Sequence, residues 1–334
     1  MPKVLITGAS GFIGSFLVEE ALNQNFEVYA GIRKTSSKQF LKDERIHFFE
    51  TQLNNKKALY ESFVEFKKSH GAFDFVIHNA GATKVRDPKD FYTINQNFTQ
   101  NLVEALHEAD CLNGKFVLMS SLAAMGPGSD ETMLPIKESD EPNPVSHYGR
   151  SKLFVERYLE GVKDLKYLIF RPTGVYGPRE KDYLIFFKTL LNKIEPYIGF
   201  KEQKITFIYV KDLCKVVIDS LRSEHENKTY CVTDGYTYSS FDFANISKEI
   251  LNAKTVKIFV PLFLAKTIAA INSLIAKIFG GSPTLNNEKI KEISRLNWQC
   301  ETDGIKKDFN FVAEYDLAKG VRESIEWYKT NGWL

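Results

Sequence analysis

The topology of this chain follows from residues 7–14, Thr7-Gly8-Ala9-Ser10-Gly11-Phe12-Ile13-Gly14, which join a short apolar run to a helical pattern. The glycines allow a tight turn and a close approach of the backbone to a pyrophosphate. The free amides and the dipole at the start of the helix favour the negative charge of such a group. A purely structural glycine turn is the alternative, but the position at the first strand-to-helix turn favours a dinucleotide site.

Short apolar runs continue this rhythm outward through the first half of the chain. Strands that alternate with helices predict a parallel sheet covered on both faces. The runs are continuous rather than alternating, as expected for strands buried on both sides. We therefore predict an α/β fold with a doubly wound parallel sheet and a smaller, mainly helical second domain. The predicted strands lie at residues 4–6, 28–32, 46–49, 73–77, 116–119 and 168–170.

The pattern changes after Arg171-Pro172, where prolines interrupt longer stretches and helical patterns come to dominate. We expect a dinucleotide-binding domain over residues 1–172. A strand near residues 228–232 should return to its sheet, so residues 205–233 are expected to belong to the same domain. The substrate domain would consist of residues 173–204 and 234–334.

Composition places the chain among ordinary globular proteins, with 43% apolar and 26% charged residues. The net charge of +2 is spread over both signs, so a nucleic-acid partner is not expected. The four cysteines lie far apart, which indicates reduced core residues and no metal site. The chain reaches its first strand without a secretion signal, and this predicts a cytoplasmic protein.

Residues 258–279 are unusually apolar, but Lys266, Asn272 and Lys277 interrupt them. A membrane span needs about 20 mainly apolar residues, so none is expected. We predict a buried helix here. A helix that lies on a membrane surface, with its lysines on the polar side, is the alternative.

The end of the second predicted strand indicates which dinucleotide is bound. NAD sites usually carry an acid there, whereas an arginine accommodates the 2′-phosphate of NADP. The sequence reads Gly31-Ile32-Arg33-Lys34, without an acid. This favours NADP over NAD, with a merely solvated pair of charges as the alternative.

Tyr148 and Lys152 are four residues apart and share one face of a helix if the segment is helical. A nearby cation favours the phenolate and is expected to lower the pKa of the phenol from about 10. Ser121 ends the fifth predicted strand, at the edge where doubly wound sheets build their sites. Together, the three side chains suggest proton exchange at an alcohol or a carbonyl.

With these motifs the chain resembles the extended short-chain dehydrogenase/reductase family, the NAD-dependent epimerase/dehydratase group. The resemblance covers nearly the whole chain and implies a Rossmann fold. It rests on the glycine turn, Ser121, Tyr148 with Lys152, and four further motifs: His78-Asn79-Ala80-Gly81, Asn95 with Thr99-Gln100-Asn101-Leu102, Arg171-Pro172-Thr173-Gly174-Val175-Tyr176-Gly177-Pro178 and Phe207-Ile208-Tyr209-Val210-Lys211-Asp212.

The resemblance implies a role for each matching position. Tyr148 would be the acid/base, Lys152 would hold the nicotinamide ribose and tune Tyr148, and Ser121 would bond the reacting oxygen. Asn95 would be either catalytic support or a structural fixture of its helix. The family often forms homodimers through the helices that carry Asn95 and Tyr148. The other expected cofactor contacts are Gly8, Ser10, Gly11, Phe12, Ile13, Arg33, Leu53, Asn79, Ala80, Gly81, Pro172 and Val175.

The family contains several reactions, and departures from its pattern discriminate between them. Leu122-Ala123 replaces the acid pair of the dehydratases, which argues against dehydration. Gly174 and Ile205 replace the asparagine and arginine that contact a sugar-nucleotide diphosphate, although Lys204 or Arg179 could compensate.

The run from Ser120 to Pro127 resembles the hydroxysteroid dehydrogenase and dihydroflavonol reductase branch. The leading hypothesis is therefore a reductase or dehydrogenase for a carbonyl or secondary alcohol of a hydrophobic small molecule. A nucleotide-sugar epimerase or reductase is the first alternative. A dinucleotide-binding sensor without catalysis is the second.

Overall fold

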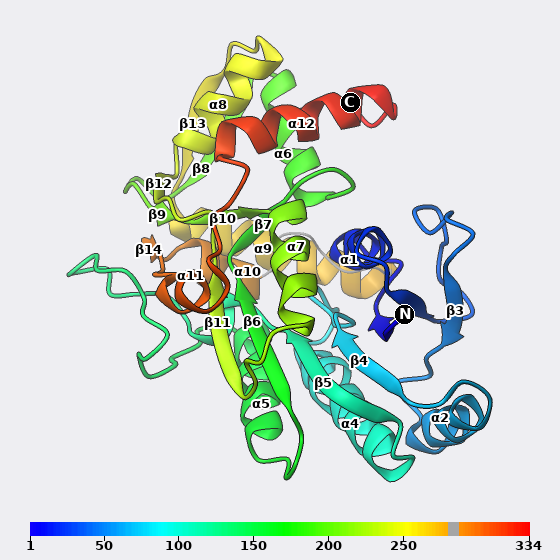
Figure 1. Ribbon diagram of the computed structural model, residues 1–334. Helices are drawn as coiled ribbons and strands as arrows, with labels where there is room; N and C mark the ends of the chain where they lie inside the picture. Colours follow the sequence, from blue (N-terminus) through cyan, green and yellow to red (C-terminus); the bar gives the residue numbers. More distant parts are fainter. Residues whose placement is uncertain (280–286) are drawn as a thin grey trace.

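A seven-stranded parallel sheet forms the centre of the molecule, in the order β11-β6-β5-β4-β1-β2-β3 (Figure 1). The computed structural model describes the backbone of residues 1–279 and 287–334 and the side chains of residues 1–272 and 287–334. All six predicted runs are confirmed as strands of this sheet. Its strands are β1 (Lys3–Thr7), β2 (Glu27–Ile32), β3 (His47–Glu50), β4 (Phe73–His78), β5 (Leu112–Met119), β6 (Tyr167–Pro172) and β11 (Lys228–Val232).

Helices cover both faces of the sheet, which explains why its strands are apolar throughout. In β1, Val4 and Ile6 pack into the cluster on one face, whereas Leu5 belongs to the cluster on the other. The first face is covered by α1 (Phe12–Asn23) and α7 (Val210–Leu221). The second face is covered by α2 (Lys56–His70), α4 (Phe98–Glu108) and α5 (His147–Glu160).

The strand order reverses at β1, which pairs with β2 on one side and β4 on the other. In doubly wound sheets, ligands bind outside the carboxyl ends of the strands at this switch point. The glycine turn follows β1 directly, and the motif at residues 78–81 follows β4. The topology therefore brings the sequence motifs to one edge.

The second body of structure lies above this edge in Figure 1. Its core is largely aromatic. It is built from α6 (Asp182–Leu191), α8 (Asp242–Leu251), α12 (Leu317–Thr330), β7 (Gly174–Tyr176) and β10 (Phe207–Tyr209). Further elements are α3 (Lys89–Phe91), the π-helical turn η1 (Tyr92–Asn97), the 3-10 turn η2 (Leu122–Ala124), α11 (Asp303–Phe309), β8 (Ile194–Ile198), β9 (Lys204–Ile205), β12 (Tyr238–Ser239) and β14 (Asn297–Trp298).

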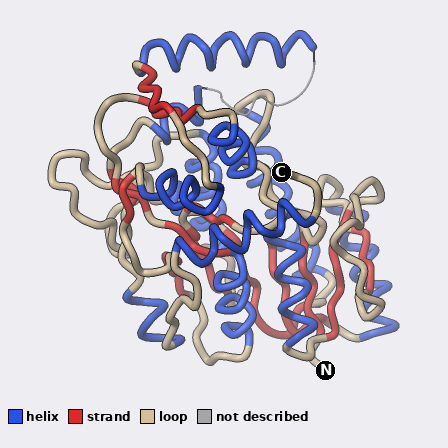
Figure 2. Tube along the Cα trace, turned by 90° about the horizontal axis from the view of Figure 1, so that it is seen from above, coloured by secondary structure: helices blue, strands red, loops and turns tan. Residues whose placement is uncertain are grey.

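The prediction of a buried helix at residues 258–279 is wrong in two respects. The segment starts within strand β13 (Val256–Val260), which pairs with β8, and only then forms α9 (Leu262–Phe279). Figure 2 shows α9 along the outer edge of the molecule, and Phe263 is 74% exposed. Apolar composition measures how much apolar surface a segment has, but not whether another element covers it. The part of the prediction that concerns side chains beyond Asn272 lies outside the described residues.

The next described helix along the chain is α10 (Asn287–Ile293). Among the described residues, no helix is long and apolar enough to cross a membrane.

Candidate active site

The turn after β1 has a shape that only glycine permits. Gly8 has a φ of +67°, and a Cβ atom on it would lie 2.8 Å from the Ala80 Cα. A Cβ atom on Gly14 would lie 2.1 Å from the carbonyl oxygen of Gly8. Gly11 stands at the N-cap of α1 and provides no side-chain hydrogen bond there. The first amides of α1 are thus open to an anion, and this cradle fits a dinucleotide pyrophosphate.

The other expected cofactor contacts lie at the same edge. Asn79, Ala80 and Gly81 follow β4, and Pro172 ends β6. Arg33 follows β2 with an exposed side chain. Farther out, the carbonyl oxygen of Leu53 accepts a hydrogen bond from Asn101 Nδ2 at 2.9 Å. Their positions agree with a dinucleotide that lies across the switch point, while their individual contacts stay predictions.

His78 links the ends of β1 and β4 to the helix beyond them. Thr99 donates its hydroxyl proton to the Asn95 carbonyl at 2.6 Å, so its oxygen accepts from His78 Nε2 at 2.8 Å. Nδ1 of His78 then accepts from the Thr7 hydroxyl at 2.8 Å. Burial lowers the pKa of His78 to about 3, with a smaller effect of Lys152. The ring therefore stays neutral and acts as a structural bridge beneath the glycine turn.

Asn95 lies buried in the π-helical turn η1, a type of distortion that is frequent at functional sites. Its Oδ1 accepts from the Ala82 amide at 2.7 Å, and its Nδ2 donates to the Ala82 carbonyl at 3.1 Å. Nδ2 also lies 3.0 Å from the Ser151 hydroxyl, which donates to the carbonyl of Tyr148. Asn95 thus ties the loop after β4 to the helix of Tyr148 and Lys152.

The three predicted catalytic side chains meet at the carboxyl ends of β4 and β5. Tyr148 lies in the first turn of α5, which Ser146 caps by accepting from the Gly149 amide at 2.9 Å. Ser121 lies two residues beyond the end of β5, at the N-cap of η2, and hydrogen-bonds the Tyr148 phenol. Lys152, one turn further along α5, is buried and donates to the Met119 carbonyl at 2.8 Å. The structure therefore brings together the groups that sequence reasoning selected.

The expected lowering of the Tyr148 pKa is wrong for the structure as it stands. Burial raises the pKa of Tyr148 to about 12, and this outweighs the lowering by the hydrogen bond with Ser121. The negative charge of Glu292 raises the pKa further. The Lys152 ammonium is held by the carbonyl of Met119 instead. Tyr148 is therefore a protonated phenol at neutral pH.

Two further residues fix this arrangement, and sequence reasoning gave neither of them a role. Glu156 and Arg171 form a buried ion pair, with Nη2 to Oε2 at 2.6 Å and Nε to both carboxylate oxygens at 3.1 Å. The Ser120 hydroxyl donates to the same carboxylate. The pair joins α5 to β5 and β6 directly behind Lys152. The available signal was spacing, because Glu156 continues the series Tyr148, Lys152 along one helical face.

Two acids of helix α10 contact the start of α5. Glu288 Oε2 accepts from the His147 amide at 2.5 Å, and Glu292 Oε1 accepts from the Ser146 hydroxyl at 2.6 Å. His147 Nδ1 lies 2.9 Å from the Tyr92 hydroxyl, which places His147 in the wall next to Tyr148. Carboxylates are favoured at the positive end of a helix dipole. The start of α5 is therefore held by two acids of α10.

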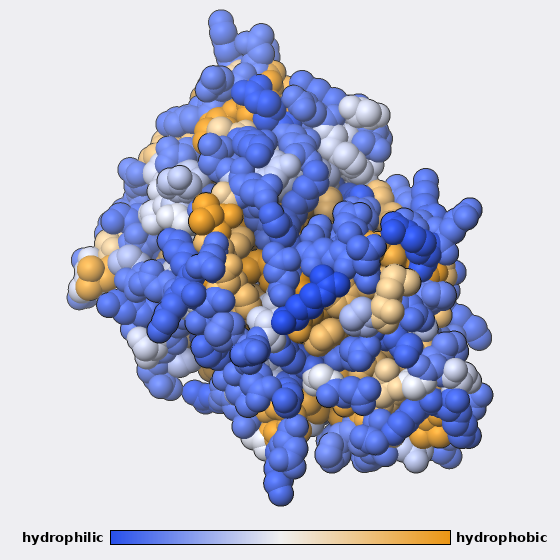
Figure 3. Space-filling view, viewed as in Figure 1, coloured by the Kyte–Doolittle hydropathy of each residue, from blue (hydrophilic) through white to orange (hydrophobic). Residues whose placement is uncertain are grey.

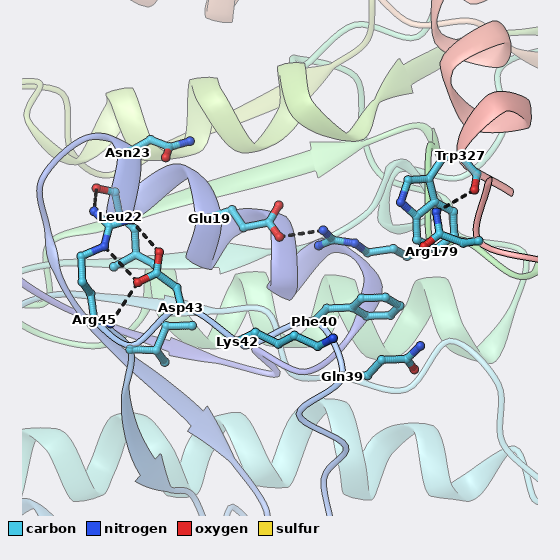
Figure 4. Close-up of a pocket in the computed structure, with 12 residues that line it drawn as sticks. Glu19, Leu22, Asn23, Gln39, Phe40, Lys42, Asp43, Arg45, Arg179 and Trp327 are labelled. Atoms are coloured by element: carbon cyan, nitrogen blue, oxygen red, sulfur yellow. Dashed lines mark hydrogen bonds and ion pairs between the residues drawn. The ribbon is translucent and has the colours of Figure 1, made fainter.

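Arg179 contacts helix α1. It donates to Glu19 at 2.6 Å and to the Ser15 hydroxyl at 2.9 Å, and it stacks on Phe16. Figure 4 shows this pair in a pocket of about 420 Å³ between α1, the loop before β3 and the C-terminal helix. Ser121, Tyr148 and Lys152 do not line this pocket. The guanidinium is thus engaged by α1.

The chain belongs to the NAD-dependent epimerase/dehydratase family, whose sequence profile matches residues 4–232. It is accordingly an enzyme of a family that works with a nicotinamide cofactor. The putative UDP-glucose 4-epimerase of Methanocaldococcus jannaschii is 26% identical over 98% of this chain and 99% of its own. The ceramide reductase of Caulobacter vibrioides is 23% identical over 99% of this chain and 96% of its own.

Solved structures agree on the fold. The UDP-glucose 4-epimerase of Thermus thermophilus, in complex with NAD, superposes with a TM-score of 0.78 at 21% identity, over 98% of this chain and 99% of its own. The relatives therefore include both sugar-nucleotide and lipid enzymes.

Proposed function

We propose that the chain is a cytoplasmic, NAD(P)-dependent reductase or dehydrogenase that acts on a carbonyl or secondary alcohol of a hydrophobic substrate. The protonated Tyr148 phenol, hydrogen-bonded to Ser121 and one helical turn from Lys152, carries this proposal. A neutral phenol is the state that a proton donor to a carbonyl needs. The ceramide reductase among the relatives supports a lipid-like substrate.

In the proposed reduction, Ser121 and Tyr148 both donate hydrogen bonds to the carbonyl oxygen of the substrate. A bound nicotinamide would supply the hydride. As negative charge develops on the oxygen, the Tyr148 phenol donates its proton there. The Lys152 ammonium stabilises the phenolate that remains, because an opposite charge close by favours the ionised form. Asn95 holds the loop and the helix around this centre.

The choice between substrate classes rests on charge. A sugar-nucleotide diphosphate calls for charge-assisted donors. Gly174 and Ile205 offer none with their side chains, and Arg179 is engaged by Glu19. The epimerase relative keeps a nucleotide-sugar epimerase or reductase as the second candidate. A dinucleotide sensor without catalysis is the third.

A combined binding and turnover screen tests this proposal. Long-chain ketones, sterol ketones and UDP-glucose would each be added with NADPH, and thermal stabilisation and cofactor oxidation measured. We expect oxidation with a hydrophobic ketone. Interconversion of UDP-glucose without net oxidation would support the epimerase. Tight NADPH binding without turnover of any substrate would support the sensor.

We propose NADP as the favoured cofactor because of Arg33. Loss of a charge-assisted bond costs about 1.5–3 kcal/mol, so Arg33→Ala should weaken NADPH binding about ten- to a hundredfold and NADH binding far less. Titration calorimetry measures both affinities. Lys34→Ala, a change at the neighbouring exposed cation, serves as the control. Equal losses for both cofactors, or a parent protein that prefers NADH, would contradict the assignment.

The Lys152 ammonium predicts a pH dependence. Burial lowers the pKa of Lys152 to about 8, so its charge is present below that pH and is lost as the pH rises through it. Affinity for NADPH should therefore decline above about pH 8. Tyr148 stays protonated over this range, because burial raises its pKa to about 12. In Lys152→Met the affinity should be low and flat with pH. A decline that persists in this variant would assign the titration to another group.

We also propose that the protein forms homodimers through α4 and α5. Most apolar residues of these helices, such as Leu102 and Val155, pack into the chain's own core. Phe154 is left 48% exposed on the outer side of α5. It offers an apolar contact for a second copy.

A further inference from the structure

Large exposed apolar side chains are concentrated on β13 and the first part of α9. A typical monomer exposes few apolar patches larger than a few hundred Å², and larger ones mark interaction sites. We call the exposed side chains of this segment the α9 face. They are Val256, Ile258, Phe259, Leu262, Phe263, Leu264, Ile268 and Ile271.

The α9 helix is turned outward. Leu264, Ile268 and Ile271 follow the spacing of a single helical face, and all three are exposed. Among the described side chains of α9, the buried ones are the small residues Ala265 and Ala269, which cluster with Ile290 of α10. In a helix that serves the chain's own core, the large apolar side chains would point inward. Figure 2 shows the helix at the periphery, where another surface can reach it.

Strand β13 extends the same surface. Val256, Ile258 and Phe259 are all exposed, and Phe259 stacks on Phe200, which is itself 71% exposed. A two-stranded ribbon with an uncovered apolar edge invites association. Figure 3 shows apolar side chains at the upper end of the molecule, where α8 and β13 lie. The strand and the helix thus both expose apolar side chains, with Val256 and Ile258 on one side of the ribbon and Phe259 on the other.

Charge indicates what covers this face. The segment from residue 252 to 279 contains four lysines and no acid, although the whole chain has nearly as many acids as bases. Lys254, Lys257 and Lys266 are exposed around the apolar side chains. A two-fold contact between copies would bring the same lysines together across the interface. Apolar side chains rimmed by lysines instead match a bilayer that carries anionic phospholipids.

We propose that the α9 face docks the enzyme on the surface of an anionic phospholipid bilayer. Its apolar side chains enter the boundary between headgroups and acyl chains, and its lysines remain at the phosphates. The docked segment is directly connected to the catalytic centre. Ala265 and Ala269 contact α10, whose Glu288 and Glu292 hold the start of α5 beside Tyr148.

Docking also defines the substrate class, a step that rests on the proposed function. A ketone or alcohol with long hydrocarbon chains is dissolved in the bilayer and hardly present in water. An enzyme that sits on the bilayer can take such a substrate from it directly.

Flotation with lipid vesicles tests docking independently of catalysis. The full chain would be mixed with vesicles of phosphatidylcholine and phosphatidylglycerol, or of phosphatidylcholine alone. We expect flotation with the mixed vesicles, weaker flotation with the neutral ones, and a decrease with added salt. Phe263→Gln combined with Leu264→Gln should weaken partitioning about tenfold or more, because each side chain contributes a large apolar area. Val312→Gln, at an apolar residue that is 81% exposed elsewhere, is the matched control.

Each outcome bears on the proposal. Equal flotation of the double variant and the control would overturn it, provided that circular dichroism shows both folded. Failure of the parent to float, together with self-association in sedimentation that the double variant abolishes, would also overturn it and assign the face to a second copy. A double variant that no longer floats but still oxidises NADPH with a short, water-soluble ketone would support docking. Loss of turnover with every ketone, with flotation intact, would contradict only the proposed function.

Discussion

Tyr148→Phe is expected to reduce turnover by about 10²- to 10⁴-fold while the affinity for NADPH stays nearly unchanged. The substitution keeps the ring, and with it the contact with Phe91 at 5.7 Å between centroids. It removes the phenolic proton that we propose is transferred to the substrate oxygen. The rate of hydride transfer in a single turnover, measured once a substrate is known, isolates this step from product release.

Ser121→Ala is the companion variant and should separate proton donation from orientation. Its hydroxyl hydrogen-bonds the phenol and lowers the pKa of Tyr148 against the larger effect of burial. Ser121→Ala should therefore slow turnover less than Tyr148→Phe. A Tyr148→Phe enzyme within about threefold of the parent rate, well short of the expected loss, would show that the proton comes from another group.

Glu156→Leu is expected to destabilise the fold by about 3–5 kcal/mol, the usual result of leaving one partner of a buried ion pair uncompensated. The Arg171 side chain is only 7% exposed, so its charge would lose its carboxylate without gaining water. The Ser120 hydroxyl would lose the same acceptor. Urea unfolding followed by circular dichroism measures the change.

Glu156→Leu combined with Arg171→Leu should recover much of this loss, because replacing both charges leaves none unpaired. Glu141→Leu is the surface control, since Glu141 pairs with Arg157 at 3.3 Å with side chains 88% and 60% exposed. It should change the free energy of unfolding by less than about 1 kcal/mol. If Glu156→Leu changes it no more than Glu141→Leu does, the buried pair does not fasten α5 to the sheet.

The parts of this molecule that sequence predicted correctly are those set by local spacing. The turn of Gly8, Gly11 and Gly14 and the interval from Tyr148 to Lys152 depend only on a strand, a turn and a helix, whose geometry is general. The six predicted strands were recognisable because helices cover both faces of the sheet.

The parts that sequence did not predict depend on which distant elements meet. The ion pair of Glu156 and Arg171 requires α5 to lie against β6, and its residues are 15 positions apart. The pKa of Tyr148 was expected to fall. It is raised instead by burial and by Glu292 of α10, a helix far from Tyr148 in the sequence. The outward orientation of α9 likewise depends on packing, which the apolar composition of the segment does not determine.

The two carboxylates of α10 bind the start of α5 through groups that depend little on the sequence of α5. Glu288 accepts from a backbone amide, and Glu292 accepts from a capping hydroxyl. Hydrogen bonds of this kind require only a free amide and a capping hydroxyl at the start of a helix. A helix α10 of different sequence that keeps the two carboxylates could therefore bind the same α5 without moving Tyr148 or Lys152. The sequence around this contact can therefore change in evolution while the position of the reaction centre is kept.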